Sequence, residues 1–269
     1  MLNRPLALDG RHTAEIRSAL TAYGPHAPLA SGPFDEADGG WGYGGVPLQV
    51  SGGVGIIPIS GILLSGPGGW LYPMASFYED IRARLDEAVE DDRIKAIALW
   101  IDSPGGVVSQ CFELADHIYH AGSRKPVVAI VYDCACSAAY ALASAAEAVT
   151  VPRSGTVGSV GVIMIHAEYS AALERAGIRT TVFRYGAHKA ELQEVEPLSA
   201  EAAAREQADI DALGEQFVTL VARNRGLNAD AIRATQAETC LGDRAVTLGL
   251  ADAVLPPHDA LADLIARFP

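Results

Sequence analysis

The chain has 269 residues, of which 49% are hydrophobic and 20% are charged, so its composition is that of a globular protein and excludes a disordered or fibrous one. This length suits one large domain that buries a substantial core. The net charge of −13 argues against a nucleic-acid partner, because binding to a phosphate backbone needs clustered lysine and arginine.

The sequence also argues against secretion and membrane insertion. The first residues, MLNRPLALDGRHTAEIRSAL, lack the unbroken apolar run and the cleavage site of a secretory signal. The most apolar early run, VGIIPISGILLSG, is interrupted by Pro58 and Gly61 and is too short to span a bilayer. We therefore expect a cytoplasmic protein without a membrane anchor. The cysteines expected to stay reduced in that compartment are Cys111, Cys134, Cys136 and Cys240.

Residues 1–50 differ in composition from the rest of the chain. They include GPHAPLASGPFDEADGGWGYGG, which is rich in glycine and proline and has neither a helical nor a strand period. This pattern predicts a flexible N-terminal arm. We expect the main domain to cover residues 51–257, and residues 258–269 to form a C-terminal helix or tail.

From residue 54 onward, apolar segments of strand length alternate with amphipathic segments of helical length. Strands are predicted at 54–63, 94–102, 126–133, 147–152, 157–166 and 179–186. A capping box formed by Ser76 and Glu79 predicts the first helix of this region. The other predicted helices lie at 107–121 and 138–146, after Pro197 and Ser199, and after the cap residue Asn228. This order predicts an α/β fold with a layered, mostly parallel sheet.

The stretch DCACSAAYALASAA, residues 133–146, lies where a predicted buried strand turns into a helix of small residues. Ser137 would stand at the start of that helix, where backbone N–H groups lack intrahelical acceptors and favour negative charge. The alanines that follow leave room for a substrate backbone. Ser137 is therefore a candidate nucleophile, and the alternative is a plain serine N-cap. Ser144, deeper in the helix, is interpreted as structural.

A second candidate element is the segment IDSPGG at the end of the preceding predicted strand. Gly105 and Gly106 offer backbone N–H groups that no side chain obstructs, at the carboxyl end of a strand where α/β sites lie. Together with Ser137 they would form an oxyanion hole. The alternative is that Pro-Gly-Gly is simply a turn.

The base that would activate Ser137 is less clear from the residues. Asp102 and Asp133 end adjacent predicted strands, so a Ser-His-Asp triad is one possibility. The histidines available to it are His117, His120, His166 and His188, of which His188 lies on a suitable loop.

Lys189, next to His188, is the other candidate base. A lysine accepts a proton from serine only when it is neutral, which burial away from carboxylates favours. Three glutamates follow closely in sequence, and we expect them to point away from Lys189 or to be screened; they are Glu191, Glu194 and Glu196.

These motifs together resemble the signal-peptide-peptidase-type serine peptidases. The resemblance rests on SPGG after a strand, CSAAYALASAA, GTVGSVGV and GAHK in this order, and it covers about residues 54–255. Within that family the chain is most similar to the soluble phage or prophage type, which includes head-maturation proteases. The segment AELQEVEP after Lys189 departs from the phage type, which usually has glycine or asparagine there.

The resemblance implies a ClpP/crotonase-like fold of stacked β-β-α units and a Ser/Lys dyad without a cofactor. It implies that Ser137 is the nucleophile and Lys189 the general base, with an oxyanion hole formed by backbone N–H groups of Gly105, Gly106 or Ala138. It also implies a homo-oligomer that cleaves peptides or proteins, with phage capsid or scaffold proteins as candidate substrates, in the host cytoplasm or the procapsid. Some members of the family complete the site with a neighbouring subunit.

Other hypotheses stay open at this point. The fold could serve as a non-catalytic capsid or scaffold module, which would assemble without cleaving any substrate. A crotonase relative that handles acyl-CoA would use SPGG for an enolate or thioester oxyanion but would leave Ser137 and Lys189 without a role. A metal site is not expected, because nothing supplies a fourth ligand beside Cys134, Cys136 and one histidine. Cys136 is expected to pack into the core rather than to act as a nucleophile.

Overall fold

The computed structural model describes residues 6–8, 48–66 and 74–269, and within these residues ten strands form one sheet. The strands are β1 (Leu6–Leu8), β2 (Gln49–Ser51), β3 (Val54–Leu64), β4 (Ala75–Phe77), β5 (Ala96–Val107), β6 (Val127–Cys136), β7 (Ala148–Val151), β8 (Thr156–Gly158), β9 (Thr239–Leu241) and β10 (Ala253–Val254). The helices are α2 (Tyr78–Glu90), α3 (Cys111–Ala121), α4 (Ala138–Ser144), α5 (Ser170–Arg175), α6 (Ala200–Arg225), α7 (Ala229–Ala234), α8 (Gly242–Thr247) and α9 (Pro257–Arg267).

The centre of the sheet is parallel. Its strand order is β10-β7-β6-β5-β3-β2, and β5 pairs in parallel with both β3 and β6. Parallel neighbours need a crossover between them, and helices α2 and α3 supply the crossovers from β3 to β5 and from β5 to β6. The predicted α/β class with a mostly parallel sheet is therefore confirmed.

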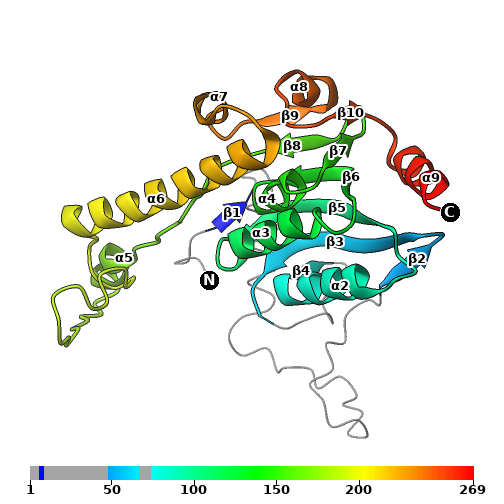
Figure 1. The fold of residues 1–269 in the computed structure, drawn as a ribbon. Coiled ribbons are helices and arrows are strands. Elements are labelled where there is room, and N and C mark those ends of the chain that lie inside the picture. Colours follow the sequence, from blue (N-terminus) through cyan, green and yellow to red (C-terminus); the bar gives the residue numbers. More distant parts are fainter. Residues whose placement is uncertain (1–5, 9–47, 67–73) are drawn as a thin grey trace, which may run out of the picture.

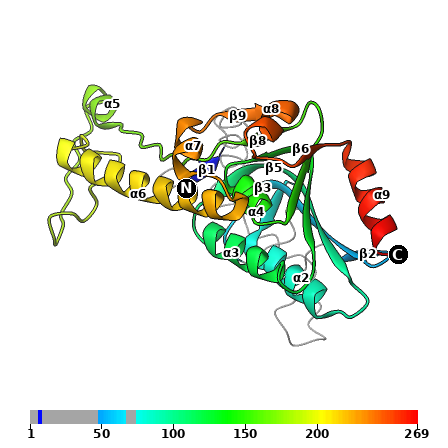
Figure 2. The same ribbon diagram turned by 45° about the horizontal axis from the view of Figure 1, so that its top comes forward.

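The apolar residues of β5 divide between two layers because side chains alternate along a strand. Ile97, Leu99 and Ile101 belong to the large core beneath the helices, whereas Ala96 and Ala98 face a smaller cluster with residues of α9. Figures 1 and 2 show α2, α3 and α4 together over one face of the sheet and α9 apart from them at its other side. Both faces are thus covered where β5 and β6 lie, as a continuous apolar strand requires.

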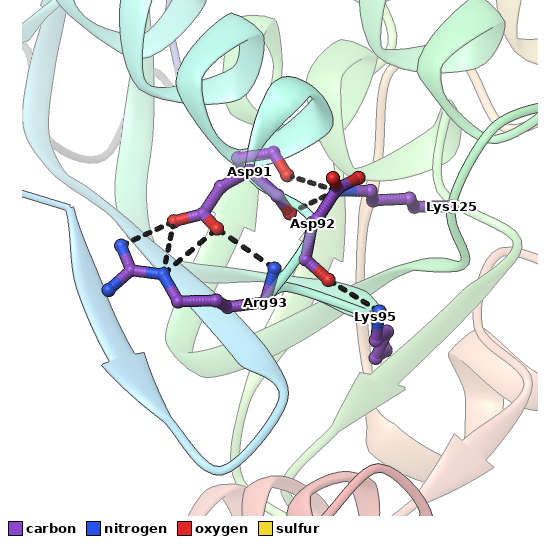
Figure 3. A network of polar contacts seen from close by, with 6 residues as sticks. Asp91, Asp92, Arg93, Lys95 and Lys125 are labelled. Atoms are coloured by element: carbon purple, nitrogen blue, oxygen red, sulfur yellow. Dashed lines mark hydrogen bonds and ion pairs between the residues drawn. The ribbon is translucent and has the colours of Figure 1, made fainter.

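A network of polar contacts fixes the turn between α2 and β5 and joins it to the segment before β6 (Figure 3). The Asp91 carboxylate accepts the backbone N–H of Arg93 at 2.9 Å and the side-chain Nε of Arg93 at 3.0 Å. The Lys125 ammonium donates to the carbonyl oxygens of Ala88 at 2.8 Å and of Asp91 at 2.7 Å. Lys95 donates to the carbonyl of Asp92. These contacts position the strands that lead to the candidate site.

Two helix caps test the local interpretation of the sequence. Ser199 accepts the N–H of Ala202 at 3.1 Å and Asn228 accepts that of Asp230 at 2.8 Å, so both predicted caps are confirmed. The capping box at Ser76 is wrong. The Ser76 hydroxyl instead exchanges hydrogen bonds with the backbone of Ser60, each 2.9 Å long, because Ser76 is paired within the sheet on β4.

The predicted strand at 179–186 is also wrong, and the one at 157–166 is shortened to β8. Residues 163–199, which we call the projecting segment, contain no buried residue and form one short helix, α5. Among the described residues, no strand pairs with residues 179–186, and an unpaired strand is not stable.

Most of the predicted N-terminal arm, residues 9–47, lies outside the described residues. Leu6–Leu8 differ from the expectation of a loosely ordered arm, because they form β1 and pair with β5. At the other end of the chain, α9 begins at Pro257. Among the described helices, none is both long enough and apolar enough to cross a membrane.

Candidate active site

Ser137 lies in a strained turn between β6 and α4. Its backbone has φ 53° and ψ −120°, a combination that residues other than glycine rarely adopt and that costs about 1–3 kcal/mol. The Ser137 N–H donates to the carbonyl of Gly158 at 2.8 Å, and the Ser137 carbonyl accepts the N–H of Ala141 at 2.9 Å. A serine held in such a strand-to-helix elbow has its hydroxyl directed by the backbone rather than by a rotamer preference.

The hydroxyl of Ser137 does not cap the helix that follows it. Ser137 is the N-cap residue of α4, yet its side chain accepts no capping hydrogen bond. Instead the hydroxyl donates weakly to the carbonyl of Gly161, at 3.4 Å. The plain N-cap interpretation is therefore wrong. Ser144 does behave as a structural residue, donating to the carbonyl of Ala141 at 2.8 Å and accepting from Asn224 at 3.1 Å.

The motif GTVGSVGV, which the sequence analysis quoted without assigning roles to its residues, holds the elbow in place. Gly158 and Gly161 provide the two carbonyl oxygens that bond the backbone and the hydroxyl of Ser137. Gly158 has φ +108°, and a Cβ atom on it would lie 2.8 Å from the carbonyl oxygen of Glu238. The loop can thus lie against the backbone of Glu238, in the conformation that bonds Ser137, only because it carries glycine there.

The SPGG segment lies beside this elbow because β5 and β6 are paired. Ser103 is opposite Ala135, two residues before Ser137. A Cβ atom on Gly106 would lie 1.9 Å from the carbonyl oxygen of Leu63, so the backbones of β3 and β5 meet too closely here for any side chain. The fold therefore brings the two predicted elements, SPGG and the serine, together.

Ser103 is a residue of this site that the sequence analysis missed. It is completely buried, and its hydroxyl donates to the carbonyl of Gly61 at 2.6 Å while accepting the N–H of Gly105 at 3.2 Å. Its place in the quoted SPGG motif, between a strand and two glycines, was the available signal. Because the Gly105 N–H already donates to Ser103, it is less available to an oxyanion than the N–H groups of the other two predicted donors, Gly106 and Ala138.

The cysteines near Ser137 are buried and reduced. Cys136, immediately before Ser137, contacts Thr156, and burial raises the pKa of the neighbouring Cys134 thiol, with Cys136 and Asp102 adding to the effect. A thiol with a raised pKa is a poor nucleophile at neutral pH. All four cysteines are free, as the sequence predicted, and all four are buried.

Lys189 is not brought to Ser137 within the chain. The lysine is exposed and lies in the projecting segment, and it shares no hydrogen bond with Ser137 in the described part of the chain. Figures 1 and 2 both show the region between α5 and the start of α6 extending away from α4, whose first residue follows Ser137. Within the monomer, the segment that carries Lys189 thus extends away from the helix that follows Ser137.

The carboxylates around Lys189 are matched by arginines. Arg205 and His188 hydrogen-bond Glu191 and lower the pKa of its carboxyl to about 2. Glu196 forms an ion pair with Arg184. For these two glutamates the expectation of screening is confirmed.

The histidines that a triad would need are engaged elsewhere or apart from Ser137. His188 is bonded to Glu191 at 2.9 Å, and His117 on α3 is bonded to Asp86 on α2 at 2.6 Å. Within the described residues, the hydroxyl of Ser137 has the carbonyl of Gly161 as its hydrogen-bond partner and no imidazole. The geometry therefore does not support a Ser-His-Asp triad in the monomer.

Comparison with known proteins identifies the family. The model of "Peptidase family S49" matches residues 120–266. The head-tail preconnector protein of Enterobacteria phage P21 is 37% identical over 216 residues, which cover 80% of this chain and 43% of that protein. The capsid assembly protease of Escherichia phage lambda is 35% identical over 79% of this chain and 49% of its own length. A putative signal peptide peptidase of Enterococcus faecium is 26% identical over 70% of this chain and 55% of its own length. The chain thus spans about half the length of these relatives.

Proposed function

Because the chain belongs to peptidase family S49, we propose that it is a serine endopeptidase with Ser137 as nucleophile. The observation that carries this proposal is the strained elbow at Ser137, whose hydroxyl caps no helix and which follows by two residues the point where β6 pairs with Ser103 of SPGG. Backbone strain of this kind is kept where the surrounding structure enforces it, and such positions cluster at active sites.

In the proposed reaction, Ser137 Oγ attacks the carbonyl carbon of a peptide bond while its proton passes to the neutral amine of Lys189. The tetrahedral intermediate collapses to an acyl-enzyme, and the departing amine takes the proton from Lys189. Water then attacks the ester carbonyl, again giving its proton to Lys189. Ser137 regains its hydrogen from Lys189 as the carboxylic product leaves.

The oxyanion of the tetrahedral intermediate requires backbone N–H donors next to Ser137. We assign this role to Gly106 and Ala138, and regard Gly105 as a weaker candidate because its N–H already donates to Ser103. Ala138 is the first residue of α4, where an N–H group has no acceptor within the helix. Gly106 lies on β5 beyond the last residue that pairs with β6.

We infer that Lys189 reaches Ser137 from a second copy of the chain. The projecting segment exposes large apolar side chains to solvent, with Phe183 93% and Tyr185 100% exposed. Aromatic residues exposed to this degree are typical of a surface that another protein covers. A homo-oligomer in which this segment packs against the neighbouring elbow would bury both Lys189 and the aromatic residues.

Proteins that participate in phage capsid assembly are the proposed substrate class. This proposal follows from the names of the relatives, a capsid assembly protease and a head-tail preconnector protein. We accordingly propose that the protein acts in the cytoplasm of an infected cell or in a procapsid. The competing hypothesis is a capsid module that keeps the fold and assembles without cleaving anything.

Labelling with a small fluorophosphonate, mapped by mass spectrometry, tests the proposal. The expected result is one adduct, on Ser137, that is lost in Ser137→Ala and slowed about a thousandfold in Lys189→Ala. Arg267→Ala, which removes an exposed cation on α9, serves as the control and should label normally. Labelling at another residue, or labelling that does not depend on Lys189, would contradict the mechanism; assembly without labelling would favour the capsid module.

A further inference from the structure

The strand β1 occupies the part of β5 that lies beside Ser137. Leu6, Ala7 and Leu8 pair antiparallel with Val107, Gly106 and Gly105. The same glycines pair with Ile62 and Leu63 of β3 on the other edge of β5. The strand β1 must therefore lie along the opposite edge of β5. This is the edge that pairs with β6 as far as Ser103, and it leads to Ser137.

The register places the end of β1 close to the nucleophile. β6 pairs with β5 as far as Ser103, which is opposite Ala135, and then leaves the sheet at Ser137. Leu8 is opposite Gly105, two residues beyond Ser103. Leu8 thus takes the sheet position that β6 would hold at Ser137 if it continued.

The direction of β1 is that of the acyl side of a substrate. Because β1 is antiparallel to β5, the chain runs from Leu6, opposite Val107, toward Leu8, opposite Gly105, and so toward Ser137. The residues that precede a scissile bond approach a nucleophile in this sense. Extended peptides commonly bind by adding a strand to a free sheet edge, and β1 does so here from within the chain.

The burial of the catalytic groups is consistent with an occupied site. Ser137 is completely buried, and Gly105 and Gly106 are buried as well. A peptide bond cannot reach a hydroxyl that has no exposed surface, so some part of the protein must move before catalysis. The segment seated on the glycines is short, with three paired residues, and its displacement breaks few hydrogen bonds.

We propose that Leu6–Leu8 are a built-in competitor of the substrate, which occupies the acyl-side edge of β5 and keeps the peptidase autoinhibited until another extended peptide displaces it. This inference rests on the proposed function, since it assigns a regulator to the same site.

Proline substitutions in the full-length chain test the inference. Successive N–H groups of a strand point to opposite sides, so one of Ala7→Pro and Leu8→Pro removes an N–H that faces β5. Ala7→Val, which keeps strand propensity, is the matched control. We expect the more disruptive proline variant to cleave an extended peptide substrate about tenfold faster than the wild type, because it loses one or two hydrogen bonds of β1. Ala7→Val should behave as the wild type.

Two further measurements separate the possible failures. Hydrogen exchange at Gly105–Val107 should be faster in the same proline variant, with the unfolding midpoint unchanged. A synthetic peptide of residues 2–10, LNRPLALDG, should restore the inhibition of that variant, and the peptide of reversed order should not.

If the fluorophosphonate labels Ser137 but both proline variants match the wild type in cleavage and exchange, the competitor is overturned and the peptidase stands. If Ser137 is labelled neither in the wild type nor in either proline variant, the proposed function fails. In that case, hydrogen exchange at Gly105–Val107 still tests whether β1 pairs with β5. Unchanged exchange in both proline variants overturns this pairing, and faster exchange shows that β1 is a structural contact without a regulatory role.

Discussion

The two residues of the proposed dyad lie in regions of opposite character. Ser137 is completely buried. Its turn is held by two backbone hydrogen bonds, one donated by Ser137 to the carbonyl of Gly158 and one accepted from the N–H of Ala141. Lys189 lies in the projecting segment, in which no residue is buried and two aromatic side chains are almost fully exposed. We therefore expect one chain to build the proposed nucleophile and oxyanion site, and the proposed base to become positioned only when a neighbour packs against the projecting segment.

This division has an energetic basis. Local openings are easiest where few apolar contacts are buried, so the projecting segment should open at a much lower free energy than the elbow. A base that must be neutral needs burial, which an exposed segment cannot provide alone. Assembly would provide it, and would couple the activity of Ser137 to the presence of a neighbour.

Complementation between two inactive variants is expected to show the largest effect of this division. Ser137→Ala and Lys189→Ala should each lower peptide cleavage by about a thousandfold or more. If the base comes from a neighbouring chain, a one-to-one mixture that exchanges subunits should regain activity at about a quarter of its sites, where an intact serine meets an intact lysine. The measurement is the rate of peptide cleavage after mixing, with subunit exchange followed by native mass spectrometry.

A matched control uses the exposed aromatic residues. Adding Phe183→Ser and Tyr185→Ser to both inactive chains should abolish the regained activity, because it removes the apolar surface that the neighbour is expected to cover. If mixed oligomers without these extra substitutions form normally but remain inactive, the base does not come from a neighbouring chain, and the dyad would have to form within one chain.

Two glycine substitutions compare close packing in the core with open space along α6. Gly106→Ala places a Cβ atom 1.9 Å from the Leu63 carbonyl oxygen, so β3 and β5 must separate, and the expected loss of stability is about 3 kcal/mol or more. Gly214→Ala meets nothing within 4 Å and fills a helix interior, so stability should rise by about 0.5–1 kcal/mol. Urea unfolding of both variants measures the difference. A Gly106→Ala protein as stable as the wild type would mean that β3 and β5 can separate at this point without a loss of stability, which contradicts the prediction.

The features that could be predicted from the sequence are those with local causes. The buried strands and the turn at residues 133–137 follow from apolar runs ended by small residues, and Ser199 and Asn228 cap helices through neighbours in sequence. For the same reason SPGG and the serine could be placed at adjoining strand ends before any geometry was known.

The features that were not predicted depend on contacts between distant segments. Ser76 has the spacing of a helix cap, but Ser60 competes for its hydroxyl from sixteen residues away. RTTVFRYG has strand-forming residues, but no strand in the described part of the chain pairs with it. Nothing local in NRPLAL indicates that Ala7 pairs with Gly106. Likewise, we expect the assembly, rather than either motif, to decide whether Lys189 meets Ser137.

The smallest expected effect concerns two carboxylates with similar pKa values in the two regions. Arg93 lowers the pKa of Asp91 to about 2 at the turn before β5, and Arg205, with His188, lowers that of Glu191 to about 2 within the projecting segment. Each carboxyl binds its proton less readily in the folded chain than in the unfolded chain. Its ion pair therefore stabilises the fold above about pH 4, and the stabilisation is lost as the pH falls toward 2.

Only one of these pairs should affect global unfolding. Arg93→Ala should lower the urea midpoint slightly at pH 6 and not at pH 2, because the turn at Asp91 unfolds together with the sheet; the effect is small since Arg93 is 84% exposed and screened by solvent. Arg205→Ala should leave the midpoint unchanged at both pH values, because the projecting segment opens locally before the sheet unfolds. An equal shift of the urea midpoint in the two variants would mean that the projecting segment and the sheet unfold as one cooperative unit. The segment around Lys189 would then be held in place within the monomer, without a neighbouring chain.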